Sequence, residues 1–251
     1  MKLPFAGRLL AVAMLTAASA ALPFSSALAQ TPEKPKVALV MKSLANEFFL
    51  TMEDGAKAYQ KEHSAEFDLI SNGIKDETDT ANQIRIVEQM IVSKVDALII
   101  APADSKAMVP VIKKAVDAGI TVINVDREFD SPFAARSTVL GDNHGMGVSA
   151  GTYICEQLDG QTDAVVAEIA GIDSLPLTQD RSQGFEDALS DCGLDVDNRV
   201  AAEFTVESGE RAAANLLQAA PKIDAIWNHD DDQGVGVMAA IENSGRDEFF
   251  V

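Results

Sequence analysis

The sequence predicts an α/β protein in which a doubly wound parallel sheet is built twice, in two similar lobes. Short, continuous apolar runs such as Val37–Met41 recur along the chain, and continuous apolarity is typical of parallel strands that helices cover on both faces. Helix-length amphipathic segments lie between these runs, which is the pattern of strand–helix–strand units. The segments 96–125 and 224–251 contain the same features in the same order: an apolar run, a polar loop, a helix, a glycine and a second apolar run. This repetition indicates a duplicated design.

The first lobe is predicted to cover residues 36–140. Its predicted strands are Val37–Met41, Phe67–Ser71, Ala97–Ala101, Thr121–Val125 and Ser137–Leu140. Two helices are predicted from apolar residues at three- and four-residue spacing, over Thr80–Lys94 and over Ala107–Ala118, where Gly119 ends the helix. Asn46 is a suitable N-cap for a further helix that starts near Phe48.

The second lobe is predicted to cover residues 141–251. Its predicted strands are Ala164–Ile169, Val200–Phe204 and Ala225–Asn228. Its predicted helices are Met146–Gln157, Gln179–Ser190, Ser208–Ala220 and a last one that ends at Ser244 and Gly245. The chain stops at Val251, inside the strand that corresponds to Val122–Val125, and such a stop leaves a sheet edge bare. We therefore expect a truncated carboxyl end and an incomplete second lobe.

Residues 1–29 have the features of a cleaved signal peptide. Lys2 and Arg8 precede an apolar stretch over 9–22, and small residues stand at 27–29. The alternative is a membrane anchor, but the apolar stretch is shorter than the roughly 20 residues that span a bilayer, and Pro23 interrupts its end. No cysteine stands at the cleavage site to carry a lipid. The expected product is an exported, soluble protein.

Charge and composition exclude several classes of protein. The chain is 47% hydrophobic and 24% charged, so it has the material for a core. Without the signal peptide it carries 18 basic and 39 acidic residues, a net charge of −21, which repels nucleic acid and anionic lipid. Cys155 and Cys192 would then lie in an oxidising compartment, where they are either a disulfide or two buried thiols.

Candidate ligand-binding residues follow the predicted strands, because open parallel sheets bind ligands beyond the carboxyl ends of their strands. Lys42 follows the first strand, and Asp126 and Arg127 follow the fourth. Of Phe48 and Phe49, we expect one to lie in the core and the other to be exposed. Aromatic faces together with Asp, Asn and Arg complement the apolar faces and hydroxyls of a carbohydrate. The alternative for Asp126 and Arg127, an exposed ion pair in a loop, would contribute little.

The sequence predicts no enzyme, no cofactor and no metal site. The acidic run after His229 consists of consecutive residues that cannot all face one ion, and no metal-binding spacing is present. No dinucleotide fingerprint, phosphate-binding loop or nucleophile elbow occurs.

Five spaced segments resemble the ribose-type periplasmic sugar-binding proteins of ABC transporters, and the resemblance covers residues 36–251. These segments are VALVMKSLANEFFLTMEDGAKA, VDALIIAPADSKAMVPVIKKAVDAGITVINVDRE, GDNHGMGVSAGTYI, QDRSQGF and IDAIWNHDDDQGVGVMAAI. The effector-binding core of lac-repressor-like regulators is similar, but those regulators carry a DNA-binding helix-turn-helix where this chain has its signal peptide. The resemblance implies the type I periplasmic binding protein fold: two Rossmann-like lobes with parallel sheets, joined by a hinge with three crossings.

The resemblance also implies a set of ligand-binding residues, which are Asn46, Phe48, Phe49, Asp126, Arg127, Phe204 and Asp230. Two further positions depart from the family's pattern: Lys42 stands where a small polar residue is usual, and Gln179 stands where an Arg would reach the ligand, while Arg181 matches a commonly structural Arg. These departures put ribose itself in doubt.

The implied function is that of a monomeric periplasmic receptor. It would capture a small sugar or polyol between its lobes and deliver it to the permease of an ABC transporter in the inner membrane. The alternatives are a sensor that presents its closed form to a membrane chemoreceptor or kinase, and a receptor for sugar acids. The last alternative depends on Lys42, whose ammonium needs an anionic partner if it is buried. Asp126, Asp230 or a ligand carboxylate could be that partner, and we favour a neutral ligand because the acidic residues nearby repel anions.

Overall fold

The computed structural model describes residues 33–251. The predicted signal peptide, residues 1–29, lies outside the described residues. Within the part of the chain that is described, no helix combines the length and the apolar character needed to cross a membrane.

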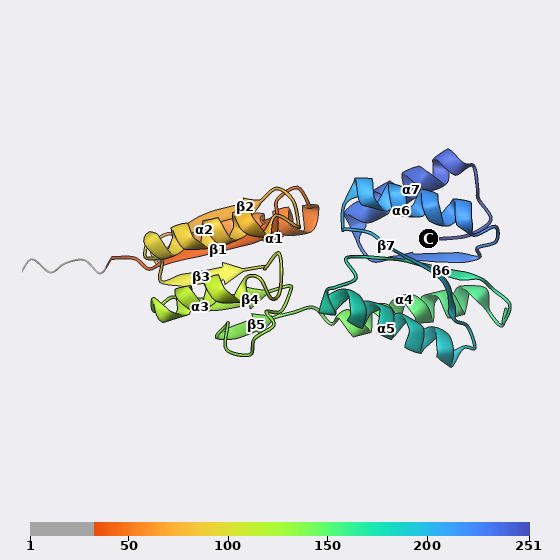
Figure 1. The fold of residues 1–251 in the computed structure, drawn as a ribbon, viewed down its shortest axis with the longest axis horizontal. Helices are drawn as coiled ribbons and strands as arrows, with labels where there is room; N and C mark the ends of the chain where they lie inside the picture. Colours follow the sequence, from red (N-terminus) through yellow and green to blue (C-terminus); the bar gives the residue numbers. More distant parts are fainter. Residues whose placement is uncertain (1–32) are drawn as a thin grey trace, which may run out of the picture. The chain divides into compact units, whose positions relative to one another are not determined.

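The first sheet has five parallel strands in the order β2-β1-β3-β4-β5 (Figure 1). The strands are β1 (Lys36–Ser43), β2 (Asp68–Ile74), β3 (Ala97–Ile100), β4 (Thr121–Val125) and β5 (Ser137–Val139), and the helices are α1 (Glu47–Glu62), α2 (Thr80–Val92) and α3 (Val109–Asp117). Alternate residues of β1 serve opposite faces: Ala38 and Val40 pack with α2 and α3, whereas Leu39 and Met41 pack with Phe49 of α1. Helices therefore cover both faces, as the continuous apolar runs predict.

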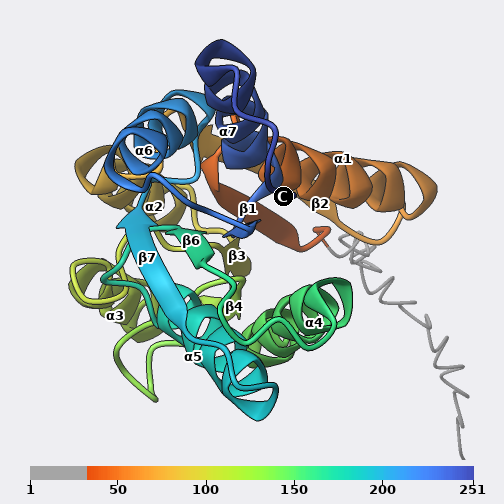
Figure 2. The ribbon, with the colours of Figure 1, turned by 90° about the vertical axis from the view of Figure 1, so that its right-hand side faces the viewer.

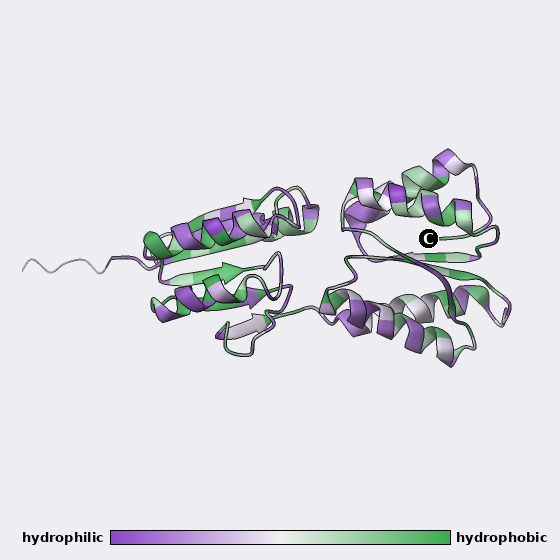
Figure 3. Cartoon of the chain, viewed as in Figure 1, coloured by the Kyte–Doolittle hydropathy of each residue, from purple (hydrophilic) through white to green (hydrophobic). Residues whose placement is uncertain are grey.

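The second sheet has three parallel strands in the order β7-β6-β8. The strands are β6 (Val166–Ala170), β7 (Val196–Ala201) and β8 (Ala225–Asn228), and the helices are α4 (Asn143–Leu158), α5 (Pro176–Asp191), α6 (Val206–Ala219) and α7 (Asp231–Ser244). One face packs on α4 and α5 and the other on α6 and α7 (Figure 2). Phe250 forms an isolated parallel bridge with Ala225 of β8. Figure 3 shows that the strands are largely hydrophobic and that the helices are of mixed character.

Glycines allow the paired helices of the second sheet to approach closely. A Cβ atom at Gly147 of α4 would overlap the backbone of α5 at Arg181 and Phe185. A Cβ atom at Gly236 of α7 would likewise overlap the backbone of α6 at Val206. Because backbone atoms cannot move aside as a flexible side chain can, only glycine fits at these two positions.

The predicted α/β fold class is confirmed, whereas the bounds of two predicted strands are wrong by three residues or more. The second strand continues past Ser71 to Ile74, because β1 is also longer and pairs with it as far as Ser43. The strand predicted at Val200–Phe204 lies at Val196–Ala201 instead. Phe204 is in a loop with a left-handed φ of 58°, a backbone conformation that ends a strand.

Candidate ligand-binding site

A pocket of about 520 Å³ lies at the carboxyl ends of strands from both sheets. Of the predicted ligand-binding residues, seven line it: Lys42, Asn46, Phe48, Phe49, Asp126, Phe204 and Asp230. Two do not, Arg127 and Gln179. This position is where parallel sheets place their ligands, since loops from several strand ends converge there.

Asn46 and the two phenylalanines form one wall of the pocket at the start of α1. Asn46 caps the helix, because its Oδ1 accepts a hydrogen bond of 3.0 Å from the Phe48 N–H. Its Nδ2 donates to the Phe204 carbonyl at 3.2 Å, which joins the two halves of the pocket. Phe49 is 3% exposed and Phe48 is 55% exposed, with their rings edge to face at 5.0 Å. The prediction that one ring is buried and the other exposed is confirmed.

Lys42 is buried beneath this wall, with only 3% of its surface exposed. Its Nζ lies 3.0 Å from Oε2 of Glu77 and 3.4 Å from Oδ2 of Asp126. The same ammonium lies 4.8 Å from the ring centroid of Phe49 and 5.5 Å from that of Phe204. The expected anionic partner is therefore present. Asp126 is one of the partners that the sequence predicts, whereas Glu77, the nearer of the two, is not.

The environment shifts the pKa values of this pair in opposite directions. Burial lowers the pKa of Lys42, although the Asp126 carboxylate acts the other way. Burial raises the pKa of Glu77, although Lys42 acts the other way. Both shifts express the cost of taking charges out of water.

Asp126 reaches the pocket because the backbone turns sharply at the end of β4. Its φ is 66°, and the Arg127 N–H donates to the Val125 carbonyl at 2.7 Å, which is a tight γ-type turn. Such turns are strained for a residue with a side chain and are concentrated at functional sites. The turn directs Asp126 into the pocket and the next residue away from it.

Arg127 lies behind the pocket and not on its surface. It is 1% exposed, and its Nη1 donates to the Ala103 carbonyl at 2.5 Å. Its Nη2 is 3.8 Å from Oε2 of Glu77, and its backbone carbonyl accepts from Nδ2 of Asn124 at 2.6 Å. Together Lys42, Glu77, Asp126 and Arg127 form what we call the buried charge cluster, in which two cations face two carboxylates.

The second half of the pocket includes residues that follow β8 and residues near the start of α5. Asp230 caps α7 by accepting from the Gln233 N–H at 2.9 Å, and burial raises its pKa. Arg181 lines the pocket, and its guanidinium donates to Oδ1 of Asn143 at 2.9 Å and to the His229 carbonyl at 2.8 Å. Gln179 is exposed and turns its amide to the Asp173 carbonyl at 3.1 Å. Arg181, and not Gln179, is the α5 residue that the structure places at the pocket.

Trp227 and His229 also line the pocket and do not belong to the set of ligand-binding residues that the resemblance implies. Their rings lie 4.2 Å apart, and Nε2 of His229 is 2.8 Å from Oε1 of the fully buried Glu168. Burial lowers the pKa of His229, although Glu168 acts the other way. The position of His229 directly after a strand was the available signal.

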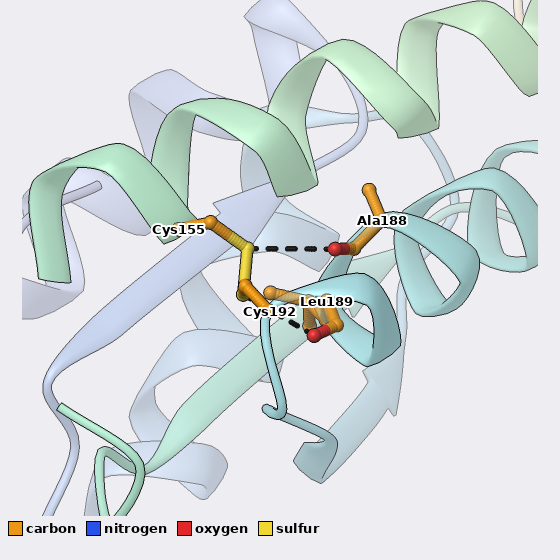
Figure 4. Close-up of a disulfide and its surroundings, with 4 residues drawn as sticks. All are labelled: Cys155, Ala188, Leu189 and Cys192. Carbon is orange, nitrogen blue, oxygen red and sulfur yellow. Dashed lines mark hydrogen bonds between the residues drawn. A yellow bond between two sulfur atoms is a disulfide. The ribbon is translucent and has the colours of Figure 1, made fainter. Parts of the chain in front are cut away.

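Cys155 and Cys192 are joined in a disulfide with a Cα–Cα distance of 6.1 Å. The bond links α4 to the residue that ends α5, where the sulfurs lie against the carbonyls of Ala188 and Leu189 (Figure 4). Arg181 is eleven residues earlier on α5, about 16 Å along a helix. The disulfide therefore lies away from the pocket lining. Residues 33–251 contain no group of three or more side chains placed to hold a metal ion.

Strand ends of two parallel sheets that meet at one polar and aromatic pocket define the class of two-lobed solute receptors, and sequence comparisons agree. The model of the family described as "Periplasmic binding protein domain" matches residues 37–251, so this chain belongs to that family.

Named relatives bind sugars. The D-ribose/D-allose-binding protein of Pseudomonas aeruginosa is 49% identical over 95% of this chain and 76% of its own length. The ribose import binding protein of Bacillus subtilis is 30% identical over 84% of this chain and 67% of its own length.

Solved structures agree as well. An ABC transporter solute binding protein from Burkholderia multivorans is 48% identical, with a TM-score of 0.78 over 85% of this chain and 76% of that one. A periplasmic solute binding protein from Actinobacillus succinogenes with bound D-allose is 31% identical, with a TM-score of 0.76 over 84% of this chain and 75% of that one.

Proposed function

We propose that this protein is a periplasmic receptor that captures an uncharged sugar of the ribose and allose type and delivers it to the permease of an ABC transporter in the inner membrane. It acts as a monomer after removal of the signal peptide and leaves the sugar chemically unchanged. The D-ribose/D-allose-binding protein and the solute binding protein with bound D-allose, both named above, support the choice of sugar.

The charge balance of the pocket is the observation that carries the proposal of an uncharged ligand. Lys42 already has two carboxylates within 3.4 Å, so it needs no anionic ligand as a partner. Burial lowers the pKa of Arg181, which also lines the pocket, although the opposite charges of Asp126 and Asp230 act the other way. A sugar acid would bring a further negative charge into a pocket lined by six carboxylates and two side-chain cations, which is unfavourable.

Each wall of the pocket offers one kind of contact that a sugar needs. Phe48, Phe49 and Phe204 supply apolar ring faces for the C–H faces of the sugar. Asp126 and Asp230 supply carboxylate oxygens, which accept charge-assisted hydrogen bonds from hydroxyl groups. Asn46 and Lys42 add hydrogen-bond donors, a side-chain amide and an ammonium group.

A titration of the purified protein tests the proposal. D-ribose or D-allose should raise the melting temperature, because a ligand that binds only the folded state stabilises it by mass action. Calorimetry should then give a dissociation constant, and the recovered sugar should be unaltered. If neither sugar shifts the melting temperature or releases heat, the proposed function is wrong.

A matched pair of variants connects the binding to the pocket. Asp126→Asn should weaken sugar binding by about 2–4 kcal/mol, because it removes a charged acceptor and one of the two counterions of Lys42. Asp130→Asn makes the same chemical change at an exposed residue that pairs with Lys106 at 3.6 Å, and it should leave the affinity unchanged. Equal affinities in both variants would show that the sugar binds elsewhere.

A further inference from the structure

Glu77 occupies a fixed place in the loop between β2 and α2. Two hydrogen bonds hold this loop against the end of β1: the Ser43 hydroxyl donates to the Lys75 carbonyl at 3.2 Å, and the Leu44 N–H donates to the Ile74 carbonyl at 3.1 Å. The glutamate that follows is 2% exposed and lines the base of the pocket. Its carboxylate is therefore held under the site by the backbone around it.

The carboxylate of Glu77 lies between two cations that come from different strand ends. Its Oε2 is 3.0 Å from Nζ of Lys42 and 3.8 Å from Nη2 of Arg127. Among residues 33–251, the buried Oε1 of Glu77 has no hydrogen-bond partner, and neither do Nε and Nη2 of Arg127. Glu77 thus acts on its surroundings mainly through its charge.

That charge decides the net charge of the buried charge cluster. With Glu77 the cluster has two positive and two negative groups, and without it Lys42 and Arg127 would outnumber Asp126, the one carboxylate left in the cluster. A net positive charge beneath a pocket attracts anionic ligands, since the low dielectric of the interior strengthens the field. We propose that Glu77 is a specificity-determining residue that, by neutralising Lys42 and Arg127, restricts the pocket to uncharged sugars and excludes sugar acids. This inference rests on the proposed function of the same pocket.

The test compares the parent with Glu77→Gln, which keeps the shape of the side chain and removes its charge. Calorimetric titrations with D-ribose, D-allose and D-ribonate give the affinity for the anion relative to the neutral sugar that binds better. This relative affinity should rise at least about tenfold in Glu77→Gln, equivalent to about 1.4 kcal/mol. Glu88→Gln is the control, because it removes the same charge from an exposed ion pair with Lys114, and it should leave the ratio unchanged.

A second set of variants tests the inference even if Glu77→Gln does not fold. Lys42→Met leaves the cluster with one excess negative charge, and adding Glu77→Gln makes it neutral again. The double variant should therefore bind the neutral sugar several-fold more tightly than Lys42→Met alone. A residue with only a structural role gives the opposite order, because a second substitution would add damage.

The outcomes separate this inference from the function on which it rests. An unchanged ratio in Glu77→Gln, or a double variant that binds no better than Lys42→Met, overturns the inference and leaves the sugar-binding function intact. A parent that binds D-ribonate as tightly as a neutral sugar also overturns the inference. A parent that binds none of the three compounds overturns the proposed function, and the inference with it.

Discussion

Gly236→Ala should destabilise the protein, because α6 and α7 pack with almost no space between their backbones. The new Cβ atom would overlap the Val206 carbonyl oxygen and lie 2.6 Å from the Glu210 nitrogen, where ordinary contacts begin at 3.4 Å. Relieving the Glu210 contact alone needs a separation of about 0.8 Å, and the tighter overlap with the Val206 oxygen needs more. Overpacking of this kind costs about 1–3 kcal/mol. Alanine is also a better helix former than glycine by about 1 kcal/mol, which offsets part of the loss.

Gly55→Ala measures the gain in helix propensity without any overpacking, because Gly55 lies inside α1 and a Cβ atom there meets nothing within 4 Å. Urea unfolding of both variants, followed by circular dichroism, gives the two changes in the free energy of unfolding. We expect Gly55→Ala to be slightly stabilising and Gly236→Ala to be about 1–3 kcal/mol less stable than it. If the two variants differ by less than about 0.5 kcal/mol, the close packing of α6 on α7 is not what holds this pair together.

Three further predictions concern the site and its support. Arg127→Ala should remain folded and weaken sugar binding by about 2–4 kcal/mol in calorimetry, because it leaves an excess negative charge in the buried charge cluster; an unchanged affinity would contradict this. Replacing Cys155 and Cys192 together by Ala should lower stability by about 2–4 kcal/mol without changing sugar affinity, and a weakened affinity would show that the disulfide shapes the pocket. Stability in urea should fall as the pH drops below about 6.5, because burial lowers the pKa of His229 and the unfolded chain then binds more protons; His229→Gln should lose this decline, and the exposed His144→Gln should keep it.

Much of the fold could be predicted because parallel strands covered on both faces appear in a sequence as short, continuous apolar runs. The strands at Thr121–Val125 and Ala225–Asn228 lie where their apolar runs predict them. Phe48 and Phe49 could be assigned to different environments because adjacent side chains of a helix point about 100° apart, so that at the edge of a buried face one is covered and the other is exposed. Asp126 could be placed at the pocket because it directly follows a buried strand.

What could not be predicted depends on contacts between distant segments. The polar run Ser71–Gly73 is typical of a turn, yet β2 continues through it because β1 pairs with it, and Gly73 leaves the space that Leu44 fills. Because the second strand was predicted to end too early, Glu77 was not recognised as a residue that follows a strand. It lies three residues past the observed strand end at Ile74. Arg127 was predicted to reach the ligand because it adjoins Asp126, but the left-handed φ of Asp126 sends the two side chains in different directions. Sequence adjacency carries no information about such a turn.

The contacts across the pocket explain why a ligand can control how its two halves meet. Asn46 donates to the Phe204 carbonyl at 3.2 Å, and the Glu47 N–H donates to Oδ2 of Asp232 at 2.9 Å. A hydrogen bond contributes only about 0.5–1.5 kcal/mol net, and an exposed one contributes less. A sugar held by aromatic faces and carboxylates from both halves adds several contacts of at least that size. Because a ligand shifts an equilibrium by its differential affinity for the two states, a sugar bound as proposed would outweigh these direct hydrogen bonds and favour the state in which the halves meet.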